Sequence, residues 1–588
     1  MSVTHPQTRC FLFFTILISF LLCGITPSAV CQTDTFIAGS GNWSNMNSWS
    51  LNQLPQSNND CVFLAGGVIT DDAAGTCQNV TFASGDSVTI GTPQATTAYL
   101  YVFGTSLINP GTITLTQISG LHIAGNAGNV VTLSGGGNIV LNSGTGITWG
   151  TTGETRLVNA DNTIQGAGTI GIGTMDLTNQ KTINANGGLL DIQPGQGGLV
   201  NTGLMEAQSG STLQFDSGFQ SIPFNNTGGT VEALAGSTVN IDGGTWTGGT
   251  FTSAGTGVIN LIGPAMNGVT NTGSMTVPSS GTPTLEGVTT NSGTIRVNSS
   301  LIYFTGNATL TGSGSLVMTG TSKLTSLNST DTLTNQQLIH GSGTIYALNV
   351  TNQSTIQADN PSSPLSLTNQ FAGGTPTTNT GTLQATSGGT LQIENTVHSI
   401  GGTIEAQNGS TVLVANGVVD GGTFTTVGTG TIQSQDATLD GRVNTPTNSG
   451  AFVVPTGYNL SLEGTIANNG TITVDSNGCI DAIQPTTLTG SGKVVLNSGS
   501  CPWQNGIAER WVGSCRRDLL DHVIVLHERH LKRLMREYLR YYHEDRTHLG
   551  LAKDTPQSRP IAATLREGGR VQSAPRIGGL HHRYTVAV

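Results

Sequence analysis

The sequence is poor in charge, and poorest in positive charge. Only 9% of the 588 residues are charged, and 33 Asp and Glu outnumber 22 Lys and Arg. Seven Lys or Arg precede residue 501, namely Arg9, Arg156, Lys181, Arg296, Lys323, Arg442 and Lys493. An active site that needs a cationic patch is therefore hard to assemble in the first 500 residues.

Cysteine is also scarce. The eight Cys are scattered, and Cys10 and Cys23 fall in an apolar N-terminal run, which excludes a disulfide-dense scaffold. Cys61 and Cys77 flank one turn-rich stretch, so they are disulfide candidates if the chain reaches an oxidising compartment. Two small buried thiols are the alternative.

Residues 1–31 are predicted to form an export signal. Arg9 precedes the apolar run FLFFTILISFLLCGI, and small residues follow it. The run is too short for a comfortable membrane span. We expect cleavage near Ala29 to Cys31 and a secreted or cell-surface product, with an uncleaved anchor or a lipid-modified Cys31 as alternatives.

Residues 32–79 place Trp43 and Trp49 ahead of the strand-like stretch CVFLAG. This segment resembles the opening of many large exported bacterial repeat proteins, where it leads into and covers the first coil of a β-solenoid. We expect both indoles to pack inside such an N-terminal cap segment. Stacking on a sugar ring is the alternative.

Residues 80–500 repeat one phrase, a turn of the type Asn-Thr-Gly or Gly-Gly followed by a short alternating strand. Examples are NTGLMEAQSGSTLQF at Asn201 and GGTVEALAGSTVNI at Gly228. Alternation with period two predicts Thr230 and Glu232 on one face of a strand, and Val231 and Ala233 on the other. We expect Gly and Asn to supply the backbone angles of the bends.

A longer period is also present. NTGSMTVPSSGTPTLEG at Asn271 returns as NSGAFVVPTGYNLSLEG at Asn448, 177 residues later. Such short strands must stack on their neighbours, so the sequence predicts a mainly β fold, a long right-handed parallel β-helix with coils of about 20–25 residues. An antiparallel sandwich array is disfavoured, because hairpin turns such as Asn-Gly are nearly absent between alternating strands.

The solenoid offers few candidates for chemistry. Asp71 and Asp72 form its densest acidic spot, which we interpret as a solvated turn, with calcium binding as the alternative. Glu206, Glu232 and Glu405 recur at equivalent repeat positions, which indicates a structural role on the outward face. Binding of a surface or polysaccharide ligand is preferred to catalysis, and a β-helix polysaccharide lyase or glycosidase remains an alternative.

The composition changes at residue 501. Residues 501–588 hold 15 of the 22 Lys and Arg but 9 of the 33 Asp and Glu, a net charge of +6 that leaves −17 for the first 500 residues. From Pro502 the sequence PWQNGIAERWVGSCRRDLLDHVIVLHERHLKRLMREYLRYYHEDRTHLG resembles the C-terminal end of the integrase core of bacterial insertion-element transposases. That family is retroviral-integrase-like and has a ribonuclease-H-like fold, so a short α-helical segment is expected.

The resemblance implies a catalytic role for one carboxylate. In the family, the Glu of the motif NG-x-x-E-R is the third acidic ligand of the catalytic Mg or Mn ions, and this role falls on Glu509. Two-metal chemistry needs three converging carboxylates. The strands that carry the family's first two Asp are missing, and Asp475, 34 residues earlier, belongs to the repeat phrase TITVDSNGC. Glu509 is therefore expected to be vestigial and to bind no metal.

The tail also predicts a basic amphipathic helix between Glu528 and Tyr542. Its apolar positions follow helical spacing, and basic residues occupy the rest of its surface. DNA phosphates would be the partner of such a surface if family binding is retained. The weak nucleic-acid-binding candidates are Arg510, Arg516, Arg517, Lys532, Arg533, Arg536 and Arg540.

Two histidine pairs, His527 with His530 and His581 with His582, raise the question of a metal site. They are interpreted as solvent-exposed, because no closed ligand set surrounds them in the sequence.

The sequence thus favours an exported structural or adhesin-like β-helix protein that carries an inactive integrase fragment. A functional DNA integrase, which would act in the cytoplasm, is the alternative. The expected domains are a signal peptide (1–31), a cap segment (32–79), a β-solenoid (80–500) and an integrase-like fragment (501–588).

Overall fold

The computed structural model describes residues 31–64, 66–92, 98–116, 119–149, 155–218, 221–368, 377–497, 502–558 and 570–587. The expected signal peptide lies outside these residues, apart from Cys31. The fold divides into two units. The N unit comprises Met1–Tyr303 with Ala308–Ser315, and the C unit comprises Phe304–Asn307 with Leu316–Val588.

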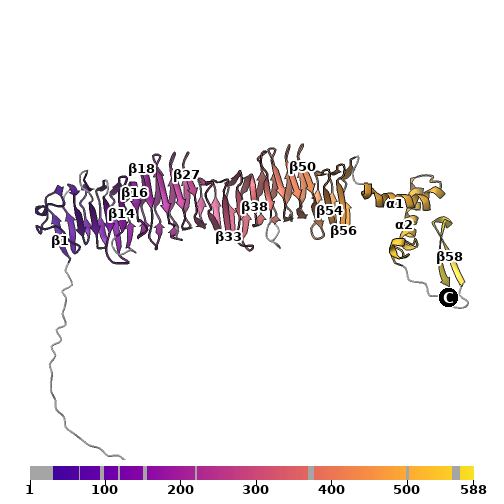
Figure 1. The fold of residues 1–588 in the computed structure, drawn as a ribbon, viewed down its shortest axis with the longest axis horizontal. Coiled ribbons are helices and arrows are strands. Elements are labelled where there is room, and N and C mark those ends of the chain that lie inside the picture. The colour runs from indigo at the N-terminus through magenta and orange to yellow at the C-terminus, as the bar shows by residue number, and fades with distance from the viewer. Residues whose placement is uncertain are drawn as a thin grey trace, which may run out of the picture. The chain divides into compact units, whose positions relative to one another are not determined.

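The chain is mainly β, and its strands stack in successive parallel coils, which confirms the predicted β-solenoid (Figure 1). One short 3-10 helix, η1 (Met46–Ser48), interrupts the first strands. The strands as far as residue 298 are β1 (Gln32–Phe36), β2 (Gly41–Asn42), β3 (Asn59–Phe63), β4 (Val68–Asp71), β5 (Ala74–Cys77), β6 (Val80–Thr81), β7 (Ser87–Ile90), β8 (Tyr99–Val102), β9 (Ser106–Ile108), β10 (Thr112–Leu115), β11 (Gly120–Ile123), β12 (Val130–Ser134), β13 (Asn138–Leu141), β14 (Gly146–Trp149), β15 (Thr155–Asn159), β16 (Thr163–Ile170), β17 (Met175–Asn179), β18 (Thr182–Ile192), β19 (Leu199–Asn201), β20 (Leu204–Gln208), β21 (Thr212–Asp216), β22 (Pro223–Asn225), β23 (Thr230–Ala233), β24 (Thr238–Asp242), β25 (Thr245–Thr247), β26 (Thr250–Ser253), β27 (Val258–Leu261), β28 (Ala265–Asn267), β29 (Thr270–Asn271), β30 (Ser274–Val277), β31 (Thr284–Asn291) and β32 (Thr294–Asn298).

The later strands of the solenoid are β33 (Leu301–Thr311), β34 (Ser315–Thr319), β35 (Lys323–Thr325), β36 (Thr332–Asn335), β37 (Leu338–Gly341), β38 (Gly343–Tyr346), β39 (Asn349–Asn352), β40 (Thr355–Ala358), β41 (Leu365–Thr368), β42 (Thr377–Asn379), β43 (Thr382–Ala385), β44 (Thr390–Ile393), β45 (Thr396–His398), β46 (Thr403–Ala406), β47 (Thr411–Ala415), β48 (Val418–Asp420), β49 (Thr423–Thr426), β50 (Thr431–Gln435), β51 (Ala437–Gly441), β52 (Thr447–Asn448), β53 (Ala451–Val454), β54 (Asn459–Asn468), β55 (Thr471–Val474), β56 (Cys479–Thr489) and β57 (Lys493–Leu496).

Strands inside the solenoid pair in parallel with the strand one coil earlier and the strand one coil later. In the N unit, for example, β20 pairs with β23, which pairs with β26. In the C unit, β43 pairs with β46, which pairs with β49. Coil length varies more than the sequence predicts. Asn335 and Asn352, on successive coils, are 17 residues apart, whereas Asn352 and Asn379 are 27 apart.

Alternation along the strands decides which side chains enter the core. In β23, Val231 and Ala233 are fully buried, whereas Thr230 and Glu232 are half-buried on the outward face, as predicted. The same pattern in the paired strands stacks apolar side chains in columns inside each coil. An isolated strand could not bury these apolar side chains, so each strand is stabilised by the coils on both sides of it.

Asparagine side chains form hydrogen-bonded columns inside the solenoid, which we call asparagine ladders. In the N unit the Nδ2 of Asn179 donates to the Oδ1 of Asn201 at 2.8 Å, and Asn201 donates to Asn226 at 2.7 Å. In the C unit, Asn335 donates to Asn352 and Asn352 to Asn379, both at 2.9 Å. All six of these side chains are fully buried. Each of these amide–amide hydrogen bonds joins a buried donor to a buried acceptor and so fixes the register of neighbouring coils, although the Nδ2 of Asn226, at the end of its series, has no partner.

The ladders correct one expectation from the sequence. The Asn of the Asn-Thr-Gly phrases, such as Asn201 and Asn379, does not adopt the left-handed backbone region, whereas Asn416 (φ +54°) and Asn477 (φ +60°) do supply such angles as expected. Glycine does supply them, for instance Gly210 with φ +76° and Gly228 with φ +82°. The recurring turn phrase thus combines a backbone function for Gly with a side-chain function for Asn.

Residues 32–79, expected as a separate cap, themselves carry paired strands. β1 pairs in parallel with β3, and β4 pairs with β7. Trp43 and Trp49 are buried against each other, with ring centroids 4.8 Å apart, and the Trp49 Nε1 donates to the Trp43 carbonyl at 3.0 Å. This confirms the prediction that the indoles pack in the core at the start of the solenoid.

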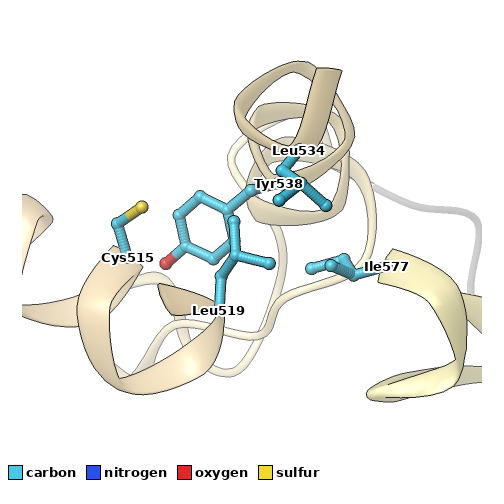
Figure 2. Packing of buried hydrophobic residues seen from close by; sticks show 5 residues of the cluster. All are labelled: Cys515, Leu519, Leu534, Tyr538 and Ile577. Atoms are coloured by element: carbon cyan, nitrogen blue, oxygen red, sulfur yellow. The ribbon is translucent and has the colours of Figure 1, made fainter. Parts of the chain in front are cut away.

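The tail of the C unit is mostly helical and has a small core of its own. It contains α1 (Pro502–Asp518), η2 (Leu520–His522), α2 (Glu528–Glu544), η3 (Leu549–Leu551), the antiparallel pair β58 (Arg570–Arg576) and β59 (His581–Ala587), and η4 (Ile577–Gly579). Its buried side chains come from α1, α2 and η4 and the residue after α1 (Figure 2); they are Cys515, Leu519, Leu534, Tyr538 and Ile577. Within the described ranges, no helix has the length and apolar content that crossing a bilayer would take.

The ladder at Asn201 yields a stability prediction. Asn201→Ala removes a buried side-chain donor and acceptor. The Nδ2 of Asn179 then loses its acceptor, and the Oδ1 of Asn226 loses its donor. We expect a loss of about 2 kcal/mol in unfolding free energy, with faster hydrogen exchange in β17, β19 and β22.

The matched control is Asn225→Ala, which removes an exposed amide one residue away from the ladder. Thermal denaturation followed by circular dichroism should separate the two variants. Equal melting temperatures would contradict a stabilising role for the ladder.

Candidate functional site

Glu509, the predicted metal-ligating carboxylate, is exposed on α1. No group of three or more His, Cys, Asp or Glu side chains is arranged to hold a metal ion anywhere in the described residues. Asp475 directly follows β55 in the solenoid and accepts a hydrogen bond from Asn497 Nδ2 at 2.7 Å. A single exposed carboxylate does not fit two bound Mg or Mn ions, which need converging ligands.

The predicted basic residues are all exposed on the two helices of the tail. On α2, Leu534 and Tyr538 face the core while Arg533 and Arg536 face away from it, as the helical spacing predicts. Acidic neighbours neutralise three of the cations. The ion pairs are Arg516 with Asp521, Lys532 with Glu528 and Arg540 with Glu544. Within the described part of the tail, Arg510, Arg517, Arg533 and Arg536 make no ion pair and contribute positive charge to the exposed surface.

Two buried or half-buried carboxylates bind the tail segments together. Asp518, at the end of α1, pairs with Arg546 at 3.0 Å and accepts a hydrogen bond from the Tyr538 hydroxyl at 3.2 Å. Burial, together with the charge of Asp518, raises the pKa of Tyr538. Asp545 pairs with Arg576 and with Arg583, its two cations from the β58–β59 hairpin. These ion pairs are structural, because each joins segments of the tail that are distant in the sequence.

The histidine pairs do not form a ligand set. His527 caps α2, its Nδ1 accepting a hydrogen bond from the backbone N–H of His530 at 3.2 Å. His581 stacks on Tyr541 with ring centroids 4.6 Å apart, and its Nε2 lies 3.0 Å from the Asp518 carbonyl oxygen. Both pairs thus have structural contacts within the tail.

Cys61 and Cys77 are joined by a disulfide, with Cα atoms 5.8 Å apart. The bond links β3 to β5, and both sulfur atoms are buried. Cys515, in contrast, is a free thiol in the core of the tail, where burial raises its pKa.

Asp71 and Asp72 do not form the solvated turn that the sequence suggests. Asp71 ends β4 with its side chain fully buried, because strand alternation turns it inward beside Trp43. Burial raises the pKa of Asp71 well above its ordinary range, and the neighbouring charge of Asp72 adds to the effect. Asp72 points outward and accepts hydrogen bonds from Asn42 Nδ2, at 2.9 Å, and from Ser44 Oγ, at 2.7 Å. No third acidic ligand completes a calcium site in the described part of the chain.

The C unit contains a charged column that the sequence analysis missed. His398 in β45, Asp420 in β48, Asp440 in β51 and Glu463 in β54 occupy the same outward position on four successive coils. Arg442 follows β51 and reaches back to this column. Each acidic member directly precedes a glycine, in the phrases VVDGG, TLDGR and SLEG. This recurrence is the signal that could have revealed the column.

The charges of the column are paired with one another. Arg442 Nη2 lies 2.7 Å from Asp440 Oδ2, and its Nε lies 3.0 Å from Glu463 Oε2. His398 Nδ1 lies 3.0 Å from Asp420 Oδ2. The hydrogen bonds from Arg442 hold the pKa of Asp440 below its usual range. A general acid needs a raised pKa, so Asp440 is unsuited to protonate a leaving group, and the column braces neighbouring coils instead.

The recurring glutamates of the solenoid face outward. Glu206 and Glu232 are directly paired positions on β20 and β23. Partial burial raises the pKa of Glu206, and the charge of Glu232 adds to this shift. Glu405 occupies the corresponding outward position on β46, between Gln384 and Thr425.

Comparison of the chain with protein-family models, with curated proteins and with solved structures finds no match. The assignment of function therefore rests on the residues and on the geometry described above.

The buried Asp71 predicts a specific pH dependence. Its pKa is higher in the folded than in the unfolded protein, so the folded state holds a proton that the unfolded state has lost. Stability from this group is complete below the ordinary pKa of 3.8 and falls as the pH rises toward the folded pKa. Asp71→Asn, which carries no charge, should raise the melting temperature at pH 7 and flatten its dependence on pH.

Asp72→Asn is the contrasting variant, because Asp72 is an outward carboxylate that accepts hydrogen bonds. It should lower the melting temperature at pH 7. A lower melting temperature for Asp71→Asn than for the unmodified protein at pH 7 would contradict the raised pKa of the buried Asp71.

Proposed function

We propose that the chain is an exported structural or adhesin-like surface protein whose solenoid acts as a binding scaffold. The observation that carries this proposal is the continuous parallel pairing of strands from coil to coil. It places polar side chains such as Thr230 and Glu232 on an outward face in successive coils. A surface of this kind suits recognition of an extended partner better than turnover of a small substrate. The charged column, with its ionised and fully paired Asp440, adds no catalytic group.

Export is supported by the N-terminal sequence. Arg9 and the apolar run from Phe11 to Ile25 have the order of a signal peptide. A disulfide between Cys61 and Cys77 suits an oxidising compartment. Both features favour a secreted or cell-surface location.

The tail is proposed to be a remnant of an integrase-type transposase with no DNA-joining activity. The motif at Asn505 to Arg510 supports the origin, and the isolation of Glu509 supports the loss of activity. A functional DNA integrase in the cytoplasm is the competing hypothesis, favoured by the motif and by the unpaired cations of α1 and α2. A β-helix lyase or glycosidase is opposed by the scarcity of basic residues, since the first 500 residues hold only seven Lys and Arg.

Export has a direct test in cells. Brief protease treatment of intact cells that express the chain should degrade it, whereas a variant without residues 2–31 should stay protected inside. Full protection of the unmodified chain, together with its recovery in the cytoplasmic fraction, would contradict the proposal and favour the integrase hypothesis.

Strand-transfer activity distinguishes the two readings of the tail. The purified chain is incubated with Mg²⁺ or Mn²⁺ and with DNA that carries the ends of an insertion element. It should join no more of this DNA than its Glu509→Ala variant. Glu537→Ala, which removes another exposed carboxylate on α2, is the matched control. Joining that depends on Glu509 but not on Glu537 would establish an active metal centre.

A further inference from the structure

Outward-facing aromatic rings are rare in the N unit and gather in one place. Among its aromatic side chains whose exposure the structure describes, all are buried except Tyr99, Tyr101, Phe103 and Tyr303. Tyr99 and Tyr101 lie on the outward side of β8, where they alternate with the buried Leu100 and Val102. Phe103 follows at the next outward position.

These rings form a continuous platform with His122 of β11. The His122 ring lies 4.5 Å from Tyr99 and 4.7 Å from Tyr101, centroid to centroid, and Tyr101 stacks with Phe103 at 6.4 Å. Gly120 and Gly146 occupy the rungs beside Tyr99, so no side chain stands over the platform there. Burial lowers the pKa of His122, which leaves the platform uncharged at neutral pH.

The platform leads into a hollow of about 500 Å³ next to Phe103. Its lining is uncharged and supplies amide and hydroxyl groups as well as backbone; the lining residues are Ser57, Gln78, Phe103, Gly125, Asn126, Ala127, Gly128 and Asn129. The Nδ2 of Asn129 is committed to backbone carbonyls, including that of Ala124 at 2.7 Å. The exposed Asn126 and the half-buried Gln78 provide the polar groups that face the hollow.

Two further hollows follow, each sharing a lining residue with the one before it. Gly128 also lines a hollow of about 410 Å³ with Arg156 and Asp176, and Gln196 lines both that hollow and a third of about 210 Å³, whose lining includes Ile222. The successive coils crossed are those of Gln78, Phe103, Asn129, Arg156, Asp176, Gly197 and Ile222. We call this row of three hollows the groove. With about 4.8 Å between coils, it spans roughly 29 Å along the stacking direction.

Charge along the groove is largely neutralised. Arg156 Nη2 lies 3.0 Å from Asp176 Oδ2, and its Nη1 donates to Thr178 Oγ1 at 3.1 Å. Through residue 303 the sequence holds 14 Asp and Glu against four Lys and Arg. An acidic polymer or a nucleic acid would therefore be repelled by this unit, and it would find no unpaired cation in the groove.

We infer that this groove binds an extended neutral polysaccharide, with a sugar ring stacked on Tyr101 and Phe103 and its hydroxyl groups hydrogen-bonded to Gln78 and Asn126. Aromatic faces match the C–H faces of a pyranose, and side-chain amides match its hydroxyls. A linear groove across several coils matches a polymer better than a compact ligand. The inference rests on the proposed function, for which it names the class of partner.

Affinity electrophoresis of the full chain tests this site. The probes are hydroxyethyl cellulose, laminarin, mannan and galactan, with polygalacturonate and alginate as acidic comparisons. At least one neutral polymer should retard the protein, and neither acidic polymer should. Tyr101→Ala combined with Phe103→Ala should weaken that retardation by about tenfold or more, since both stacking rings are lost.

Two variants keep the result interpretable. Tyr101→Phe keeps the ring and should bind within about twofold of the unmodified protein. Tyr458→Ala removes a half-buried outward tyrosine of the C unit and should not change binding. Circular dichroism of each variant checks that the solenoid is folded.

Retardation by no neutral polymer, or retardation that the double alanine variant leaves unchanged, would overturn the inference. Either result leaves the proposed function intact if the chain is accessible to protease on intact cells. Conversely, a cytoplasmic chain that binds a neutral polymer through Tyr101 would refute export while supporting the groove.

Discussion

Register between coils is the constraint on which the rest of the solenoid depends. A shift of one residue in a single coil would turn its apolar side chains to solvent and its polar ones to the core. The asparagine ladders oppose such a shift, because a buried amide at Asn201 or Asn352 has its partners only when the next coil is in register. An unpartnered amide in that position would cost more than a paired one contributes, so the ladders act mainly through specificity.

The fold was largely predictable, because alternation and repetition are strong local signals. Glu232 and Val231 lie on the predicted faces, and α2 buries Leu534 and Tyr538 as its spacing indicates. The role of Asn was not predictable from one turn phrase. Its side-chain partner lies a full coil away, at a separation that varies between 17 and 27 residues. Asp71 was misread for a related reason, since neighbouring charge suggested solvent whereas strand alternation turned the side chain inward.

Candidate sites were harder to predict than the fold. The platform of Tyr101 and His122 joins residues about one coil apart, and the column of Asp420 and Asp440 does the same in the C unit. Neither is contiguous in the sequence, because stacking rather than chain proximity brings the side chains together; only the recurring acidic residue before a glycine hints at the column. The integrase-like motif gave the opposite outcome. It is contiguous and specific in sequence, yet Glu509 has no converging carboxylates in the described residues.

The tail nonetheless has the features of a folded segment. Its helices and hairpin are joined by the buried Tyr538 and by ion pairs of Asp518 and Asp545 with arginines distant in sequence. A fragment of a larger enzyme can keep such local contacts after it loses the strands that carry the rest of an active site. Structure in the tail is therefore compatible with loss of catalysis.

The central proposal is that the solenoid is exported and that its outward face is available to partners. Cysteine accessibility on intact cells tests this proposal most directly. In a Cys31→Ser background, Thr230→Cys and Val231→Cys place a thiol on the outward and on the inward side of β23. A membrane-impermeant maleimide should label the cysteine at position 230 on intact cells and leave the cysteine at position 231 unlabelled. Labelling of position 230 only after lysis, or equal labelling of both positions, would contradict the account.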